Sequence, residues 1–298
     1  MTPPARPTTI DLPVLGRFHV ASALANLAAH SVPGAEETDV AAGTHRRLLR
    51  ADGVDHEIRL TLTGATPEAP GTRVVLEHDA TSASASAALV ATVDRWFALS
   101  TDPAPTERRL SDHPLLAPLV AARPGLRVVG HPDAFEAAVA TVLGQQVSLG
   151  AARTFAGRLV AAFGTPGPGG LTRFPTPAEL AAADVDDLRE RVGLTGARAR
   201  TVHALATAVA GGLDLGGDPA EARAALLALP GIGPWTVDFL AVRVFGDRDA
   251  FCPGDLVLRR ALGVTAPREA ERLAEPWRPD RALALVHLWT DASYLGPA

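Results

Sequence analysis

The sequence predicts a small α+β unit followed by two mainly α-helical lobes, in a chain of 298 residues that is longer than one average domain. Between residues 38 and 77 apolar side chains alternate, as at Ile58 and Leu60, which is the period of a half-buried strand. After His113 strand patterns nearly vanish, and apolar residues recur at helical spacing. We therefore assign residues 1–112 to the α+β unit with its linker, and residues 113–298 to the helical region.

Four segments are expected in the N-terminal unit. Residues 16–30 carry apolar positions at helical spacing, and residues 38–77 have the pattern of a small antiparallel sheet with Gly and Pro between its strands. Residues 84–99 again have helical spacing. A linker over residues 101–112 holds two prolines, so we expect turns there instead of regular structure.

The helical region contains a series of segments with helical spacing, most of them separated by Gly and Pro. One start is marked by a capping box, with Thr176 before Pro177 and with Glu179 in the first turn. The expected helices cover about residues 114–122, 133–147, 149–163, 177–190, 196–211, 221–228, 235–245, 255–262, 267–274 and 280–293.

Charge and cysteine usage exclude several classes of site. The chain has 28 Arg and no Lys, so a Schiff base on lysine is chemically impossible. The single Cys252 excludes a disulfide within the chain, a four-cysteine iron–sulfur cluster and a thiolate zinc cage, and it fits a cytoplasmic location. No signal peptide or membrane span is expected. The net charge of −5 neither supports nor excludes a nucleic-acid partner.

The string LPGIGPWT, residues 229–236, predicts an anion-binding turn between two helices. Gly231 and Gly233 permit positive φ and place no side chain between the backbone and a ligand. The helix that begins at Pro234 leaves N–H groups unpaired in its first turn and carries partial positive charge there. Such a turn binds phosphate without Lys or Arg. The alternative for a short glycine pattern is a simple connection between packed helices.

This turn, together with FCPGD at residues 251–255, resembles the helix-hairpin-helix of the HhH-GPD superfamily of DNA glycosylases. Further segments resemble AlkA-type DNA-3-methyladenine glycosylase II, and the resemblance covers essentially residues 113–298. The N-terminal unit occupies the place of that family's N-terminal domain. The further segments are ARPGLR (122–127), DAFE (133–136), LGQQVS (143–148), FPTP (174–177), WRP (277–279) and HLW (287–289).

The resemblance implies a base excision repair enzyme that flips an alkylated purine of the 3-methyladenine type out of double-stranded DNA and hydrolyses its N-glycosidic bond. Asp255 is then the catalytic carboxylate, which stabilises positive charge on the sugar. Relatives that also nick the strand carry a lysine after the hairpin, where this chain has Trp235. We therefore expect a monofunctional enzyme that leaves an abasic site. No metal held by side chains and no cofactor are expected, apart from a monovalent cation on hairpin carbonyls, and the chain is expected to be a monomer.

The same resemblance assigns the DNA contacts. Gly231, Gly233, Pro234 and Thr236 grip a phosphate at the start of the second hairpin helix. From their position alone, Arg259 and Arg260 follow Asp255 by about one turn, and we expect one of them, Arg259, to contact the DNA backbone near the lesion. A second basic run, over residues 189–200, either contacts phosphates or pairs with the acidic residues that precede it.

The base pocket and the wedge are assigned in the same way. Trp289 and Phe239 line the pocket for the flipped base, and Trp235 is partly structural. Core packing is the alternative for Phe239. Gln145 and Gln146 lie in the turn that supplies the wedge, with Gln146 at the wedge position; a surface pair that caps a helix is the alternative.

Two other functions remain open from the residues alone. A glycosylase of the same fold could act on deaminated or other damaged bases, and its pocket would then be more polar. A catalytically silent helix-hairpin-helix DNA-binding protein would not need Asp255. Electron-rich aromatic residues around the motif favour cationic alkylpurines.

Overall fold

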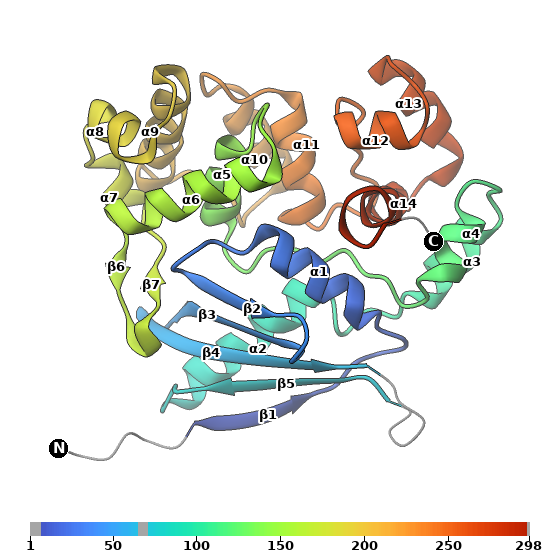
Figure 1. Ribbon diagram of the computed structural model, residues 1–298, viewed down its shortest axis with the longest axis horizontal. Coiled ribbons are helices and arrows are strands. Elements are labelled where there is room, and N and C mark those ends of the chain that lie inside the picture. Colours follow the sequence, from blue (N-terminus) through green and yellow to red (C-terminus); the bar gives the residue numbers. More distant parts are fainter. Residues whose placement is uncertain (1–6, 65–70, 297–298) are drawn as a thin grey trace.

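The chain forms an antiparallel sheet with two helices, above which the helical region is stacked (Figure 1). In this computed structural model, the described residues are 7–64 and 71–296. The sheet has the strand order β1-β5-β4-β3-β2, with every pair antiparallel. Its elements are β1 (Thr8–Leu12), α1 (Val20–His30), β2 (Glu36–Asp39), β3 (Thr44–Ala51), β4 (Val54–Thr63), β5 (Arg73–His78) and α2 (Ala83–Phe97).

The alternating residues of the sequence face one hydrophobic core. Ile58, Leu60 and Leu62 of β4 are buried, and they pack with β5, α1 and α2. The small antiparallel sheet is therefore confirmed. Strand β1 was not expected, because only its last residue, Leu12, is buried and its neighbours are Pro and polar residues. It pairs with β5 at the edge of the sheet.

Up to residue 296, the helical region contains α-helices, three short helical turns and one two-stranded hairpin. In chain order its elements are α3 (Ala104–Ser111), α4 (Ala117–Ala122), α5 (Ala134–Leu143), α6 (Leu149–Phe163), β6 (Thr165–Pro166), η1 (Pro168–Gly170), β7 (Thr172–Arg173), α7 (Pro177–Ala181), α8 (Val185–Val192), α9 (Gly196–Ala210), α10 (Pro219–Leu227), α11 (Pro234–Arg243), α12 (Leu256–Ala261), α13 (Pro267–Ala274), η2 (Glu275–Trp277), α14 (Arg281–Trp289) and η3 (Thr290–Tyr294).

Two expectations about these elements were wrong. The linker over residues 101–112 contains helix α3, since Pro103 caps it and Pro105 lies in its first turn, where proline costs no hydrogen bond. The single helix expected at 177–190 is broken into α7 and α8. Asp184 interrupts it, because its carboxylate accepts hydrogen bonds from two backbone N–H groups and starts a new helix.

Two hydrophobic cores define the two helical lobes. One core joins α5 to α10 with the first half of α11, and it also takes Val32 and Ala35 from the N-terminal unit. The other joins the end of α11 with α12, α13 and α14, and it includes Leu110, Leu116, Val120 and Leu126 from before α5. The second lobe therefore uses both ends of the helical region, and α11 runs from one core into the other. No helix in the described ranges is long and apolar enough to cross a membrane.

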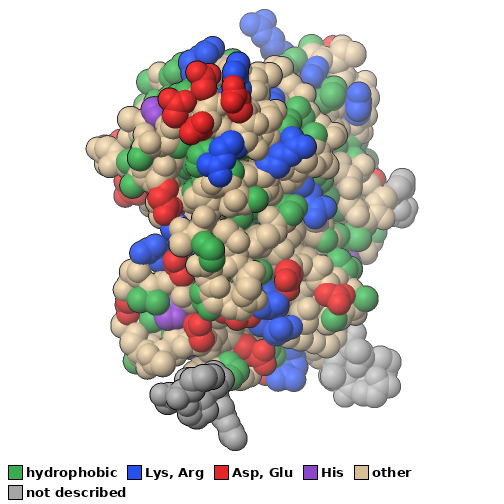
Figure 2. All heavy atoms as spheres, turned by 60° about the vertical axis from the view of Figure 1, so that its left-hand side comes forward, with side chains coloured by type: hydrophobic (Ala, Val, Ile, Leu, Met, Phe, Trp, Pro, Cys, Tyr) green, Lys and Arg blue, Asp and Glu red, His purple; other side chains and the backbone are tan. Residues whose placement is uncertain are grey.

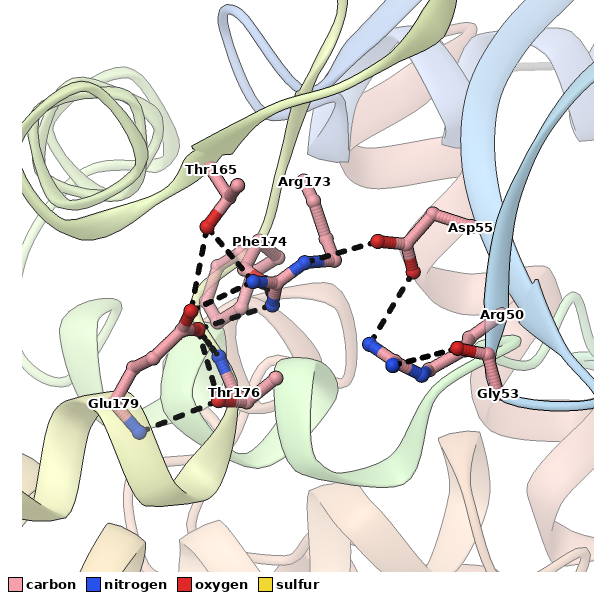
Figure 3. A network of polar contacts seen from close by, with 8 residues as sticks. All are labelled: Arg50, Gly53, Asp55, Thr165, Arg173, Phe174, Thr176 and Glu179. Atoms are coloured by element: carbon pink, nitrogen blue, oxygen red, sulfur yellow. Dashed lines mark hydrogen bonds and ion pairs between the residues drawn. The ribbon is translucent and has the colours of Figure 1, made fainter.

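An ionic network ties the helical region to the sheet (Figure 3). Arg173 of β7 donates two hydrogen bonds to Glu179, at 2.7 and 3.0 Å, and lies 3.1 Å from Asp55 of β4. Glu179 also completes the expected capping box with Thr176. The hydrogen bonds from Arg173 lower the pKa of Glu179 to about 2. These ionic contacts therefore hold the hairpin β6–β7 against the sheet.

Candidate active site

Asp255 is the N-cap of α12, and three N–H groups hold its carboxylate. The backbone N–H of Leu258 donates to Oδ1 at 2.8 Å, and the indole N–H of Trp289 donates to the same oxygen at 3.0 Å. The indole N–H of Trp235 donates to Oδ2 at 3.2 Å. An indole N–H can only donate, so both side chains orient Asp255 as an acceptor. The carboxylate therefore has one fixed position between α11, α12 and α14.

Three aromatic rings pack against one another beside this carboxylate. The rings of Trp235 and Phe239, one helical turn apart on α11, lie 5.7 Å apart at 30°. The Phe239 ring lies 5.6 Å from that of Trp289. The sequence placed Trp289 and Phe239 in a pocket and Trp235 partly in a structural role. The structure brings all three together, and Trp235 both lines the cavity and orients Asp255.

A cavity of about 270 Å³ opens between these rings and the N-terminal unit. Asp255 lies in its wall, and the end of α5 forms another side. Several polar residues of the wall were missed by the sequence analysis, because they come from distant segments and form no local motif. They are Asn26, His30, His131, Thr141, Arg243, Ser293 and Tyr294.

Arg243 places a buried positive charge at this cavity. Its side chain is buried, and its guanidinium lies 5.8 Å from the centre of the Phe239 ring and 5.5 Å from that of Trp289. It donates to the carbonyl of Val129 at 2.5 Å and makes no ion pair with a carboxylate among the described residues. Buried charges are usually paired with an opposite charge. The positive charge of Arg243 therefore acts on any base that is bound in the cavity.

The hairpin between α10 and α11 has the geometry of an anion site. Gly231 has a φ of 83°, and a Cβ there would lie 2.0 Å from Oγ1 of Thr201. Gly233 has an ordinary φ of −111°, and a Cβ there would meet nothing within 4 Å. Within the described residues, the backbone N–H groups of Gly231, Gly233 and Trp235 make no hydrogen bond. They are free to bind a phosphate beside the exposed ring of Pro234.

Gln145 and Thr236 support this hairpin from inside. The Gln145 amide donates to the carbonyl of Gly231 and to the hydroxyl of Thr236, each at 3.0 Å, and Thr236 is buried. These two side chains therefore contact the protein where the sequence predicted DNA contacts. Gln146 is exposed, at a left-handed φ of 55°, in the turn that borders the cavity. Arg198 holds this turn through the Gln145 carbonyl at 2.5 Å.

Several basic side chains are also used within the protein. Arg259 donates to the carbonyl of Thr265, and Arg191 donates to a backbone carbonyl of α6 at 2.7 Å. Arg189 lies 3.5 Å from Asp186. On the face that carries α8 and α9, acidic and basic side chains are intermixed (Figure 2). This face fits the self-paired alternative for the basic run.

One group of potential metal ligands lies under the cavity, between the two units. Ligand atoms of Glu36, His131 and Glu136 lie within 4.8 Å of one another. Arg47, however, donates to both carboxylates at 2.5 Å. A guanidinium already occupies the position between the acids, so the group fits an ionic network better than a metal site. Burial lowers the pKa of His131 to about 3, which keeps its ring neutral.

Comparisons with known proteins agree with this geometry. The description "AlkA N-terminal domain" matches residues 9–133, and "HhH-GPD superfamily base excision DNA repair protein" matches residues 139–278. Residues 139–278 therefore belong to the HhH-GPD superfamily, and residues 9–133 form an AlkA N-terminal domain. The fold is likewise similar to that of a 3-methyladenine DNA glycosylase from Archaeoglobus fulgidus, with a TM-score of 0.79, 21% identity and coverage of 96% of this chain and 98% of that one.

Two curated relatives have higher identity. The probable bifunctional transcriptional activator/DNA repair enzyme AlkA of Mycobacterium tuberculosis is 39% identical over 97% of this chain and 58% of its own length. DNA-3-methyladenine glycosylase 2 of Escherichia coli is 38% identical over 58% of this chain and 63% of its own length. The chain thus spans less than two thirds of the length of either relative.

Proposed function

We propose that this protein is a monofunctional DNA glycosylase of base excision repair, which hydrolyses the N-glycosidic bond of alkylated purines of the 3-methyladenine type. The observation that carries this proposal is the position of Asp255, held by two indole N–H groups in the wall of an aromatic cavity. The names of the relatives support the same activity. The partner is double-stranded DNA with damaged bases, and the enzyme acts in the cytoplasm as a monomer.

The chemistry follows from the fixed carboxylate. A base flipped into the cavity stacks on the rings of Phe239 and Trp289. As the glycosidic bond breaks, positive charge develops on the sugar, and a preoriented carboxylate stabilises it by about 2.7–4 kcal/mol. Water then attacks C1′ and leaves an abasic site. An alkylated purine needs no general acid, because it departs as a neutral base.

The absence of lysine supports hydrolysis without strand nicking, since no ε-amine exists for a Schiff base. A nicking relative has a lysine at the position of Trp235. In this protein the Trp235 indole N–H donates a hydrogen bond to Asp255. We expect no protein–DNA adduct when the reaction is treated with borohydride. A trapped adduct would contradict this part of the proposal.

DNA affinity comes from the free amide groups of the hairpin, and we extend the proposal to a monovalent cation held by hairpin carbonyls. The Gly231 carbonyl accepts from Gln145 and keeps a second lone pair, so it remains one of the hairpin carbonyls that could hold the cation. DNA affinity should then be higher in potassium than in tetramethylammonium at equal ionic strength. Equal affinities would contradict the cation and leave the enzymatic proposal intact.

Arg243 favours a second candidate, a glycosylase for deaminated purines. Its positive charge lies against both stacking rings, which weakens the attraction of those rings for a cationic base. Release of free bases from methylated DNA and from hypoxanthine-containing DNA, identified by chromatography, separates the two. Release of hypoxanthine alone would replace the first proposal by the second, and release of neither would point to a silent DNA-binding protein.

A further inference from the structure

The turn between α5 and α6, residues 144–148, carries Gln146, the residue predicted to be the wedge; we call it the wedge turn. Within the described residues, the backbone N–H groups of residues 146–148 make no hydrogen bond. Gln146 is exposed and has a left-handed φ of 55°, which is uncommon for a residue with a Cβ. The position of Gln146 therefore depends on contacts that its neighbours make with other elements.

Gln145 connects the wedge turn to two such elements. Its side-chain amide has two hydrogens, and it donates to the carbonyl of Gly231 in the hairpin and to the hydroxyl of Thr236 on α11, each at 3.0 Å. Its backbone carbonyl accepts from Arg198 of α9 at 2.5 Å. The guanidinium of Arg198 in turn lies 5.6 Å from the centre of the Phe155 ring. Both amide hydrogens are therefore used within the protein.

The hairpin, by contrast, has supports of its own. Ile232 is buried, and its N–H donates to the carbonyl of Leu229 at 3.2 Å. The N–H of Thr236 donates to the carbonyl of Gly233 at 3.0 Å, and Thr236 is also buried. Loss of the Gln145 amide should therefore release the wedge turn more than it releases the hairpin.

We propose that Gln145 is a positioning residue for base flipping, which holds Gln146 at a fixed distance from the phosphate-binding hairpin. The free amides of Gly231 and Gly233 belong to that hairpin, so a DNA backbone bound there has the Gln146 side chain at one set place along its base stack. Phosphate binding and filling of the gap left by the flipped base are then performed by one connected unit. This inference rests on the proposed glycosylase function, with Gln146 as its wedge, and specifies how the wedge is positioned.

A double-mutant cycle between the two glutamines tests this role. Gln145→Met keeps an unbranched side chain and removes both donors, whereas Gln146→Ala removes most of the wedge side chain and keeps the backbone constraint. Thr207→Val is the matched control, because it removes a side-chain hydrogen bond to a backbone carbonyl on an exposed part of α9. Melting temperatures verify that each variant is folded.

The probe is a duplex with a 2′-fluorinated hypoxanthine nucleotide next to 2-aminopurine. The fluorine destabilises positive charge on the sugar and so slows cleavage, which separates flipping from base release. The 2-aminopurine fluorescence rises when its neighbour leaves the base stack, and the rise at saturating protein gives the flipping constant. Affinity for an undamaged duplex is measured in parallel.

We expect Gln145→Met to lower the flipping constant about fivefold, the value of one neutral hydrogen bond, and to change the affinity for undamaged DNA by less than about twofold. In the Gln146→Ala background the same substitution should lower the flipping constant by less than about twofold, because no wedge is left to position. Thr207→Val should behave like wild type.

Equal factors in the two backgrounds would mean that Gln145 does not act through Gln146, and they would overturn the inference. An unchanged flipping constant, a loss no larger than that of Thr207→Val or matched by the loss of affinity, or a wild type that gives no rise in fluorescence would overturn it as well. A wild type that flips the probe and releases no base from methylated or hypoxanthine-containing DNA contradicts the proposed catalysis, whereas the cycle still decides how the wedge is positioned.

Discussion

At the scale of single residues, the arrangement around Asp255 favours a fixed charge over a proton acceptor. Three N–H donors use three of the roughly four lone-pair positions of the carboxylate. Only about one lone-pair position of the carboxylate is left to face the sugar of a flipped nucleotide. Its contribution is therefore electrostatic, and it depends on the two indoles that hold it in place.

Substitution of Trp289 by Phe tests this dependence. Phe keeps an aromatic ring at this position but is smaller than the indole, so the N–H to Oδ1 is lost together with part of the ring contact. A hydrogen bond to a charged group is worth about 1.5–3 kcal/mol, so the single-turnover rate of base release should fall tenfold or more. Trp277→Phe is the control, because Trp277 is buried against Phe251 and away from the cavity. Equal rates for both variants would show that the indole N–H does not matter.

The sequence pointed to the part of this site that lies in continuous motifs. The hairpin string and FCPGD drew attention to Trp235 and Asp255, because their spacing is a local property, whereas Phe239 and Trp289 were assigned only through the family resemblance. Arg243 lies on the same helix but outside the recognised string, and the polar residues of α1 meet it only through tertiary packing. No local pattern could have revealed them.

At the scale of elements, the two hairpin glycines have different reasons to be glycine. Gly231 needs its left-handed φ and the absence of a Cβ, whereas Gly233 has ordinary backbone geometry and open space. Sequence reasoning treated the two as equivalent. Only the backbone conformation separates a folding requirement from a binding requirement.

Alanine at each position should therefore act on a different property. Gly231→Ala should destabilise the fold by about 1–3 kcal/mol, because a strained φ combines with a steric clash at Thr201. Gly233→Ala should change stability by less than about 1 kcal/mol and still weaken DNA binding several-fold, because its methyl group enters the space over the free amides. Melting curves and DNA titrations measure the two effects. If Gly233→Ala binds DNA like wild type, the phosphate does not lie there.

Helix boundaries, too, could be predicted only in part from the sequence. Helices α6 and α13 coincide with the segments expected at 149–163 and 267–274, because apolar spacing and end signals agree there. Helix α3 was missed because prolines in a first turn look like turn residues when no tertiary contact is known. The expected domain boundary at residue 112 stays a prediction. The end of α3 nevertheless contributes Leu110 to the core of the C-terminal lobe.

At the scale of the whole molecule, buried charge joins the sheet to the helical region. Arg47 of β3 bridges Glu36 and Glu136, and all three side chains are almost fully buried. Burial and the charge of Glu136 raise the pKa of Glu36 to about 7, although Arg47 opposes the shift. The ordinary pKa is 4.5, so the folded protein retains this proton where the unfolded chain loses it. The contribution of Glu36 to the free energy of unfolding is complete at pH values below 4.5 and is lost as the pH rises towards 7.

Glu36→Gln removes the titratable carboxyl group, and with it the pH dependence of stability that this group causes. The Gln side chain has the same shape and can still form hydrogen bonds. Unfolding free energies of wild type and variant should diverge between pH 5 and 7, with wild type losing up to about 1.4 kcal/mol per pH unit relative to the variant. Urea unfolding at several pH values measures both. Titratable groups that do not contact this network are common to both proteins and cancel in the difference. Parallel curves would mean that Glu36 titrates normally in the fold.

The decisive measurement is the release of free bases from methylated DNA by wild type and Asp255→Asn, with binding of undamaged DNA measured in parallel. Asn preserves the N-cap hydrogen bond to Leu258, so the variant should fold. Asp214→Asn, in an exposed loop, is the matched control. We predict that Asp255→Asn slows base release about 100- to 1,000-fold, with DNA affinity within about threefold of wild type. Release at the wild-type rate would contradict the assignment of the chemistry to Asp255.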